Sequence, residues 1–273
     1  MLADDVPAVA ELTAAAFSRE IADEVDARRW RERNAYPLTT DPDGAFVAEL
    51  DGRIVGVAQA IVRERLWVLS RLAVAPDIQS AGAGRDLFDR ALEYGRTTDA
   101  GLIVSSNDPR ALRLYAGSGF AMHPTFRADG LVDRRALPRN HAGVIEDDRI
   151  DDPESLAGLT RAIRGAPYNG ELRFALERGG RLLRLGDRGF AVVDPAAGPF
   201  VLVARDEAAA SALLWHALAM TDGPIRVRWI TSAQPWAIDV LVAARLELVA
   251  YGALCVRGAP GTLRPFLPSA PFA

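Results

Sequence analysis

The spacing of apolar and polar positions predicts helices and strands in an order that occurs twice. Apolar residues recur at helical intervals in residues 5–17, while shorter apolar runs farther along have the length of strands. Asp51-Gly52 separates two such runs and predicts a hairpin turn. The elements predicted in the first half are helices at 5–17 and 23–34, the hairpin, a strand ended by Pro76, a helix at 85–97, the strand GLIVSS, a helix capped by Asn107 or Asp108, and the strand FAMHPTF.

The second half repeats part of this order after a polar stretch, residues 127–155, which reads as a linker. Its predicted elements begin with the helix LAGLTRAIRG and a set of short strands. The helix AAASALLWHALAM, the strand IRVRWITS, the helix QPWAIDVLVAARL and the strand LVAYGALCVRG follow. A shift of 126 residues places Pro109 on Pro235 and Phe120 on Leu246. We therefore expect two related domains, 1–135 and 136–273. The closing proline-rich segment, APGTLRPFLPSAPFA, is expected to lie extended over the surface.

Composition narrows the class of protein. The 273 residues carry a net charge of −4, which argues against nucleic acid as a partner. No apolar run of about 18 residues is present, so no membrane partner is expected, and the first residues do not resemble a secretory signal. The single cysteine, Cys255, cannot form an internal disulfide, which fits a cytoplasmic protein. The three histidines are scattered, so no metal is expected, and the exclusive use of Arg as the basic residue suggests a bacterial, GC-rich genome.

The candidate chemistry begins at a predicted strand-to-helix junction, VAPDIQSAGAGR, residues 74–85. The first amides of a helix lack internal partners and favour anions, and glycine lets a phosphate approach the backbone. A tight turn, or a helix packed close to a sheet, would explain the small residues equally well. The loop is neither a Walker loop, since no Gly-Lys-Ser/Thr follows, nor a dinucleotide fingerprint, since the third glycine is missing.

Two motifs in order give this loop a context. Gln79-x-x-Gly82-x-Gly84 resembles the pyrophosphate loop of the GNAT superfamily of acetyl-CoA-dependent N-acetyltransferases, and the segment from Asn107 to Phe120 resembles the same family's Asn-x-x-Ala-x-x-Leu-Tyr-x-x-x-Gly-Phe segment. The resemblance covers about residues 1–130; more loosely, the whole chain resembles a bacterial tandem group with a degenerate second domain. It implies an α+β fold of two tandem GNAT-like domains, each with a mixed, mostly antiparallel central sheet flanked by helices.

The resemblance also implies roles for individual residues. Tyr115 would protonate the leaving thiolate as the catalytic acid, although a packed helix aromatic is the alternative. Three groups of residues are implied to bind acetyl-CoA. The strand edge along pantetheine consists of Leu72, Ala73 and Val74, and Asn107 lies near the pantetheine arm. The loop on the pyrophosphate consists of Gln79, Ser80, Ala81, Gly82, Ala83, Gly84 and Arg85.

The general base is harder to identify. Many relatives carry a strand glutamate where this chain has Ser70, which departs from the family pattern. Glu64, at the end of the preceding strand, is the nearest carboxylate and is the predicted base; a solvated hairpin charge is the alternative. The charged segment 20–33 has the length to cover an acceptor pocket, or is simply a solvated face.

The second half has lost these features. The 126-residue shift places Ala233 on Asn107 and Leu241 on Tyr115, and Asp206 and Glu207 precede a helix where the first half has glycines. Carboxylates at a helix start cap it and repel phosphate. We therefore expect the second domain to complete the acceptor cleft, to pack on the first, or to form a homodimer.

Together these features predict an acyltransferase that moves the acetyl group of acetyl-CoA directly to a primary amine of a small-molecule acceptor. The alternative is a non-catalytic acetyl-CoA-binding sensor or interaction module on the same scaffold.

Overall fold

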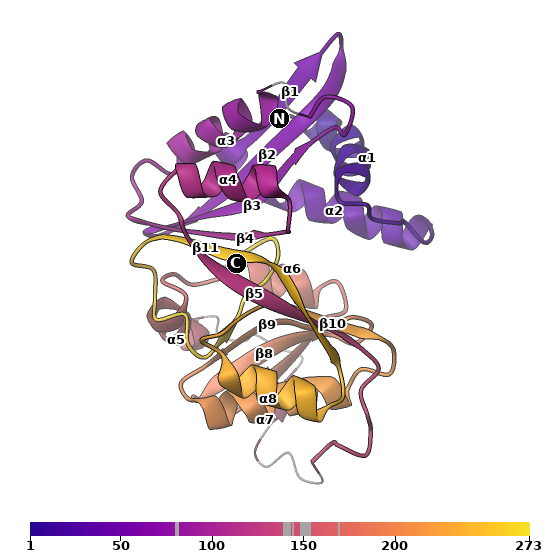
Figure 1. Ribbon diagram of the computed structural model, residues 1–273, viewed down its shortest axis with the longest axis vertical. Helices are drawn as coiled ribbons and strands as arrows, with labels where there is room; N and C mark the ends of the chain where they lie inside the picture. Colours follow the sequence, from indigo (N-terminus) through magenta and orange to yellow (C-terminus); the bar gives the residue numbers. More distant parts are fainter. Residues whose placement is uncertain (80–81, 139–142, 144, 148–153, 169) are drawn as a thin grey trace. The chain divides into compact units, whose positions relative to one another are not determined.

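The chain forms two compact units in the computed structural model, Met1–Asp99 with Phe272, and Ala100–Pro271 with Ala273 (Figure 1). The structure describes residues 1–79, 82–138, 143, 145–147, 154–168 and 170–273. The compact units therefore divide before β4, not at residues 135 and 136, and the assignment of domains 1–135 and 136–273 stays a prediction.

The first unit is a three-stranded antiparallel meander with helices on both faces. Its elements are a 3-10 turn Ala3–Asp5, α1 Val6–Ala16, α2 Glu24–Thr40, a 3-10 turn Pro42–Gly44, β1 Ala45–Leu50, β2 Arg53–Arg63, β3 Leu66–Val74 and α3 Ala83–Tyr94. The hairpin predicted at Asp51-Gly52 is confirmed, and its two residues have the positive φ values of 50° and 76° that a two-residue turn needs.

Neighbouring residues of β2 show which helix covers which face. Val57 packs in one cluster with Val9 and Leu12 of α1. A Cβ built on the adjacent Gly56 would lie 2.7 Å from Leu87 of α3. Because successive strand residues face opposite sides of a sheet, α1 and α3 cover opposite faces of this meander.

The second unit contains two mostly antiparallel groups of strands. Its elements are β4 Ala100–Ser105, α4 Pro109–Gly117, β5 Ala121–Gly130, β6 Ile145–Asp147, α5 Glu154–Ile163, α6 Glu171–Leu176, β7 Arg181–Arg184, β8 Gly189–Asp194, β9 Gly198–Ala204, α7 Glu207–Ala219, β10 Ile225–Thr231, α8 Pro235–Ala243, β11 Glu247–Gly258 and β12 Phe266–Leu267. The strand orders are β4-β11-β5-β10 and β12-β9-β8-β7-β6.

The predicted internal repeat is visible in the element boundaries. Helix α4 begins at Pro109 and α8 at Pro235, 126 residues later, and β5 and β11 begin at Ala121 and Glu247, the same interval. The two repeats exchange their last strands: β11 pairs with β4 and β5, and β5 pairs with β11 and β10.

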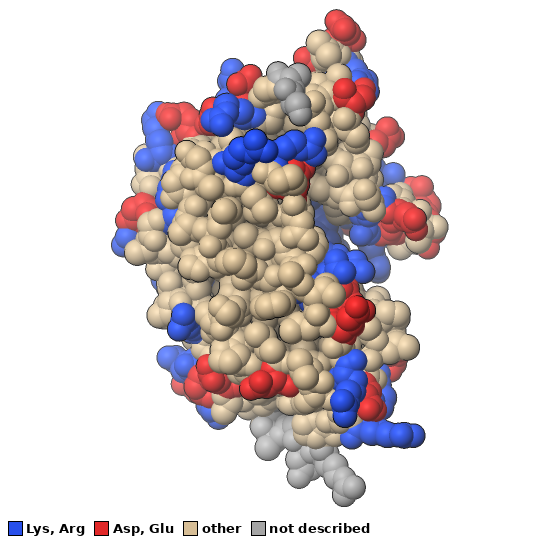
Figure 2. All heavy atoms as spheres, in the orientation of Figure 1, with Lys and Arg blue, Asp and Glu red and all other residues tan. Residues whose placement is uncertain are grey.

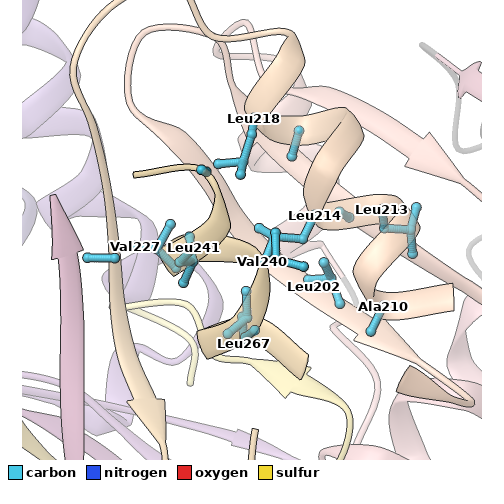
Figure 3. Packing of buried hydrophobic residues seen from close by; sticks show 14 of the residues in the cluster. Leu202, Ala210, Leu213, Leu214, Leu218, Val227, Val240, Leu241 and Leu267 are labelled. Carbon is cyan, nitrogen blue, oxygen red and sulfur yellow. The ribbon is translucent and has the colours of Figure 1, made fainter. Parts of the chain in front are cut away.

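A large apolar core holds the second repeat together. Leu213, Leu214 and Leu218 of α7 pack against Leu241 of α8 and Leu202 of β9 (Figure 3). Trp236 is 4% exposed within the same cluster, so it serves as core packing rather than as the wall of a ligand pocket.

Two sequence expectations for this unit are wrong. Residues 127–155 are not a simple linker, because β5 continues to Gly130 and β6 pairs with β7. The C-terminal segment does not lie over the surface: Phe266 pairs with Val203 of β9 and is 1% exposed. The side chain of Gln234 fixes this segment, since its Nε2 donates to Leu263 O (2.7 Å) and its Oε1 accepts from Phe266 N (3.1 Å).

Charged side chains of both signs lie next to one another on the face seen in Figure 2. Among the helices that the structure describes, none is long and apolar enough to cross a membrane.

Candidate active site

The residues predicted to carry the chemistry fall in both units. The strand edge and the phosphate loop belong to the first unit, and Asn107 and Tyr115 belong to the second. Ser80 and Ala81 lie outside the described residues. Within the described part of the chain, no three His, Cys, Asp or Glu side chains are grouped as metal ligands would be.

The predicted phosphate loop leads from β3 into a helix whose N-cap residue is a glycine. Gln79 Nε2 donates to Val74 O (3.2 Å), which ties the loop back to the end of the strand. Gly82 is the N-cap of α3 with φ of 94°, and as a glycine it supplies no capping side chain. Because the first-turn amides of a helix lack internal partners, this end is suited to an anion.

The two glycines of the loop serve different purposes. Gly82 takes a positive φ that other residues rarely adopt, and an added Cβ there would meet nothing within 4 Å. At Gly84 an added Cβ would lie 3.4 Å from Val74 Cγ2, so close packing of helix on strand also occurs. Ala83 and Arg85 lie in the first turn of α3, where Arg85 N donates to Gly82 O (2.9 Å).

Helix α7, which follows β9 in the second repeat, is closed at the corresponding end. The side chain of its N-cap, Asp206, accepts a hydrogen bond from Ala209 N (2.8 Å). The same carboxylate pairs with Arg188 at 2.6 Å, which holds its pKa below the usual range together with the Ala209 amide. The protein therefore supplies its own anion at α7, as the sequence suggested.

The strand residues predicted to bind pantetheine are paired on one edge. Leu72, Ala73 and Val74 lie opposite Ala58, Val57 and Gly56 of β2, in that order. The side chain of Ala73 is buried against α1. A pantetheine contact would therefore need the other edge of β3, and this role stays a prediction.

A β-bulge interrupts β3 at Ser70. Gln59 of β2 lies opposite Arg71 and the next residue, Ala60, lies opposite Leu69, so Ser70 is the extra residue. Before the bulge, Trp67 faces α3, where its Nε1 donates to Ala91 O (2.8 Å). After it, Arg71 faces α2, with its guanidinium 5.5 Å from the Trp30 ring centroid. Residues 67 and 71 would share a face in a regular strand, so the bulge turns Arg71 to the α1/α2 side.

Glu64 lies in the turn between β2 and β3. It is exposed and has a φ of 52°. The loop begins at the other end of β3, a strand of nine residues from Leu66 to Val74 that spans about 26 Å. Glu64 therefore lies at the opposite end of β3 from the loop, and its role as the base stays a prediction.

Tyr115 is buried in α4. The helix is capped by Asp108, whose side chain accepts from Arg110 N (2.9 Å), as predicted. Tyr115 is 5% exposed. Burial, and then the nearby Cys255 thiol and Asp108 carboxylate, raise the pKa of its phenol above the usual value. The phenol therefore carries its proton at neutral pH, as a catalytic acid must.

Asn107 has a structural partner that the sequence did not reveal. Its Oδ1 accepts a hydrogen bond from Gly252 N, in the bulge of β11. Gly252 cannot be replaced without movement, because a Cβ there would lie 1.8 Å from Ser105 O. Asn107 thus helps to hold the exchanged strand β11 beside β4.

Sequence reasoning also missed a polar cluster beneath α2. Arg71 Nη1 donates to Gln59 Oε1, and Gln59 Nε2 donates to Asn34 O (2.8 Å). The one available signal was an arginine within the apolar run LSRLAV, and its partners come from segments distant in the sequence.

Comparison with known proteins agrees with this architecture. Residues 6–120 match the family model described as Acetyltransferase (GNAT) family. The mycothiol acetyltransferase of Streptomyces coelicolor is 34% identical over 99 residues, which are 34% of this chain and 32% of that protein. The match therefore spans only about a third of that relative's length.

Solved structures show the same fold over nearly the whole chain. A putative acetyltransferase from Pyrococcus horikoshii has a TM-score of 0.82 at 19% identity, covering 98% of this chain and 92% of that one. A tandem GNAT protein from the clavulanic acid biosynthesis pathway has a TM-score of 0.59 at 16% identity, covering 94% and 97%. The resemblance to the GNAT family is confirmed over residues 6–120, and the solved structures confirm the mixed, mostly antiparallel fold with flanking helices.

Proposed function

This chain contains a GNAT acetyltransferase domain, and from that premise we propose that it transfers the acetyl group of acetyl-CoA to a primary amine of a small-molecule acceptor. The observation that carries the proposal is the start of α3. Helix α3 begins after the loop that follows β3, and its N-cap Gly82 makes no side-chain capping bond, whereas the corresponding end of α7 is closed by Asp206. An anionic cosubstrate such as a pyrophosphate would bind the first of these and not the second.

In the proposed reaction the amine nitrogen attacks the thioester carbonyl carbon, the new C–N bond forms and the C–S bond breaks. Tyr115 gives its phenolic proton to the departing thiolate and regains one from solvent. The surplus proton of the amine passes to water, since Ser70 occupies the place of the strand carboxylate and Glu64 lies in the distant hairpin turn. Asn107 contributes its amide NH2 group to the pantetheine arm, because its Oδ1 is engaged by Gly252.

A small-molecule acceptor is supported by the relatives that are mycothiol acetyltransferases, such as that of Streptomyces coelicolor. The single buried cysteine is compatible with a reducing cytoplasm as its location. The second candidate function is an acetyl-CoA sensor without turnover. The hydroxyl of Ser70 in place of a carboxylate favours it.

Gly84→Glu tests the proposal, because it puts bulk and negative charge where the pyrophosphate would lie. We expect calorimetry to show that acetyl-CoA binding is lost while the thermal midpoint of unfolding is kept. Gly223→Glu is the matched control, since an added Cβ at Gly223 meets nothing within 4 Å. Unchanged affinity in Gly84→Glu would contradict the cofactor assignment. A thiol-release assay over a panel of amines separates the two functions, because a sensor would bind acetyl-CoA and release no thiol.

A further inference from the structure

Arg71 is a buried cation whose partners are neutral. The residue is 6% exposed, its Nη1 donates to the Gln59 carboxamide, and its guanidinium lies near the Trp30 ring. No ion pair among the described residues includes Arg71. Burial of a charge without an opposite charge is costly, so this arrangement needs an explanation.

Strand β2 of the same unit also carries a buried arginine, Arg63, and the charge of that residue is neutralised by a carboxylate. Arg63, also 6% exposed, pairs at 2.8 Å with Asp41, which is 3% exposed. The Asp41 carboxylate further accepts from Val62 N (2.9 Å) and from the hydroxyl of Tyr94 (3.0 Å). The contrast shows that Arg71 is an exception within its own unit.

The surroundings of Arg71 add positive charge. Burial, and then the positive charge of Arg33, lower the pKa of Arg71 to about 9. The Arg19 guanidinium also lies over the Trp30 ring, 4.8 Å from its centroid, although Arg19 is paired with Asp26. An anion placed at Arg71 would therefore relieve an unfavourable charge instead of competing with an internal carboxylate.

The position of Arg71 connects it with the proposed reaction. It follows the bulged Ser70 directly and precedes Leu72, the first residue of the predicted pantetheine strand. The hydrogen bond to Gln59 orients the guanidinium of Arg71 through Nη1. The remaining N–H donors of the planar guanidinium can then bind two oxygens of one group.

We propose that Arg71 binds a carboxylate of the acceptor, so that the amine acetylated by this protein is an amino acid or a short peptide with a free carboxylate. The assignment rests on the proposed acetyltransferase function. Trp30 packs beside the bound carboxylate, and Gln59 acts as a positioning residue for the guanidinium.

The test uses three matched amines: an α-amino acid, its carboxamide, and the aminophosphonate of the same side chain. With the unaltered full chain, kcat/KM for the carboxylate is expected to exceed that for the carboxamide on the order of 10- to 100-fold. Arg71→Gln should remove this preference through a higher KM for the carboxylate. Arg71→Lys, which keeps the charge and loses the fork, should give an intermediate preference.

Arg65→Gln is the control, since Arg65 lies in the exposed turn of the same strand pair and faces Asp99. It should leave the preference for the carboxylate unaltered. The thermal midpoint of Arg71→Gln should equal or exceed that of the parent, because the variant removes a buried unpaired charge.

A second measurement does not depend on turnover. Calorimetry with the N-acetylated amino acid and its amide, both reaction products, should show tighter binding of the carboxylate by the parent chain and equal binding by Arg71→Gln. Equal use or equal binding of carboxylate and amide by the parent would overturn the proposal, as would a preference for the phosphonate. Loss of acetyl-CoA binding or of all thiol release would instead count against the acetyltransferase function, and the product-binding comparison would still decide the role of Arg71.

Discussion

The hydroxyl of Thr125 donates a hydrogen bond to the main-chain oxygen of Tyr251, and these two residues are 126 positions apart. That interval also relates α4 to α8 and β5 to β11, so Thr125 and Tyr251 hold equivalent places in the two repeats. Equivalent residues of two copies meet only near a two-fold axis, and the antiparallel pair of β5 and β11 contains it. The exchange of last strands follows from this symmetry.

The exchange predicts that residues 1–135 do not fold alone. Without residues 136–273, β5 loses both β11 and β10, the strands with which it pairs, and its amide and carbonyl groups are left unpaired on both edges. We expect the fragment to be insoluble or to unfold without a cooperative transition, by circular dichroism and size-exclusion chromatography. Co-expression with residues 136–273 is the control and should restore a soluble complex. A monomeric fragment 1–135 with a cooperative transition would contradict the prediction.

The raised pKa of Tyr115 predicts the pH dependence of the proposed reaction. Because burial raises the phenol pKa above its ordinary value of 10.0, Tyr115 keeps its proton below pH 10. We therefore expect kcat not to fall between pH 8 and 10 through loss of this acid. Because the phenol pKa is higher in the folded than in the unfolded chain, Tyr115 contributes fully to folding stability below pH 10, and this contribution is lost as the pH rises above 10.

Removal of the Tyr115 hydroxyl is the complementary change. Tyr115→Phe keeps the ring in its buried position and removes the proton, so kcat should fall about 100-fold, with little change in acetyl-CoA affinity. Steady-state kinetics beside calorimetry measures both quantities. A Phe variant as active as the parent would show that Tyr115 is only a packed helix aromatic.

The buried pair of Arg63 and Asp41 predicts a large loss of stability when one partner is removed. Arg63→Gln leaves the Asp41 carboxylate buried without its cation, which should lower the free energy of unfolding by about 3–5 kcal/mol. Urea denaturation followed by circular dichroism measures the change. Arg71→Gln provides the comparison at equal burial and should not be destabilised to this extent. A similar loss in both variants would mean that Arg71 also has a structural charge partner.

The elements that the sequence predicted well are those with local signals. Asp51-Gly52 specifies its own turn, and Asp108 and Asp206 cap helices through hydrogen bonds to amides two or three residues away. The glycine at position 82 was likewise predictable, because the positive φ of the backbone at that residue is a local requirement. Helix α2 was predicted to end near residue 34, but it continues through a buried Pro37 to Thr40.

The features that the sequence did not predict depend on distant partners. The place of β11 between β4 and β5 is decided by pairing across more than a hundred residues, which no local pattern reports. Arg71 acquires its surroundings from Gln59 and Trp30 only after the bulge at Ser70 turns it to the α2 face. The burial of the C-terminal segment likewise depends on Gln234 and β9, while its prolines suggested an irregular surface chain.

The contrast between α3 and α7 predicts one acetyl-CoA per chain. The pyrophosphate would lie on the open start of α3, whereas Asp206 occupies the start of α7 and is held there by Arg188 and by Ala209 N. A phosphate would have to displace this carboxylate against its charge. Calorimetry on the full chain should therefore give a stoichiometry of one. Gly84→Glu should reduce it to none, and Asp206→Ala should leave it at one, because α7 also lacks the glycines that permit close approach. Two bound cofactors in the parent chain would show that the second repeat is not degenerate in binding.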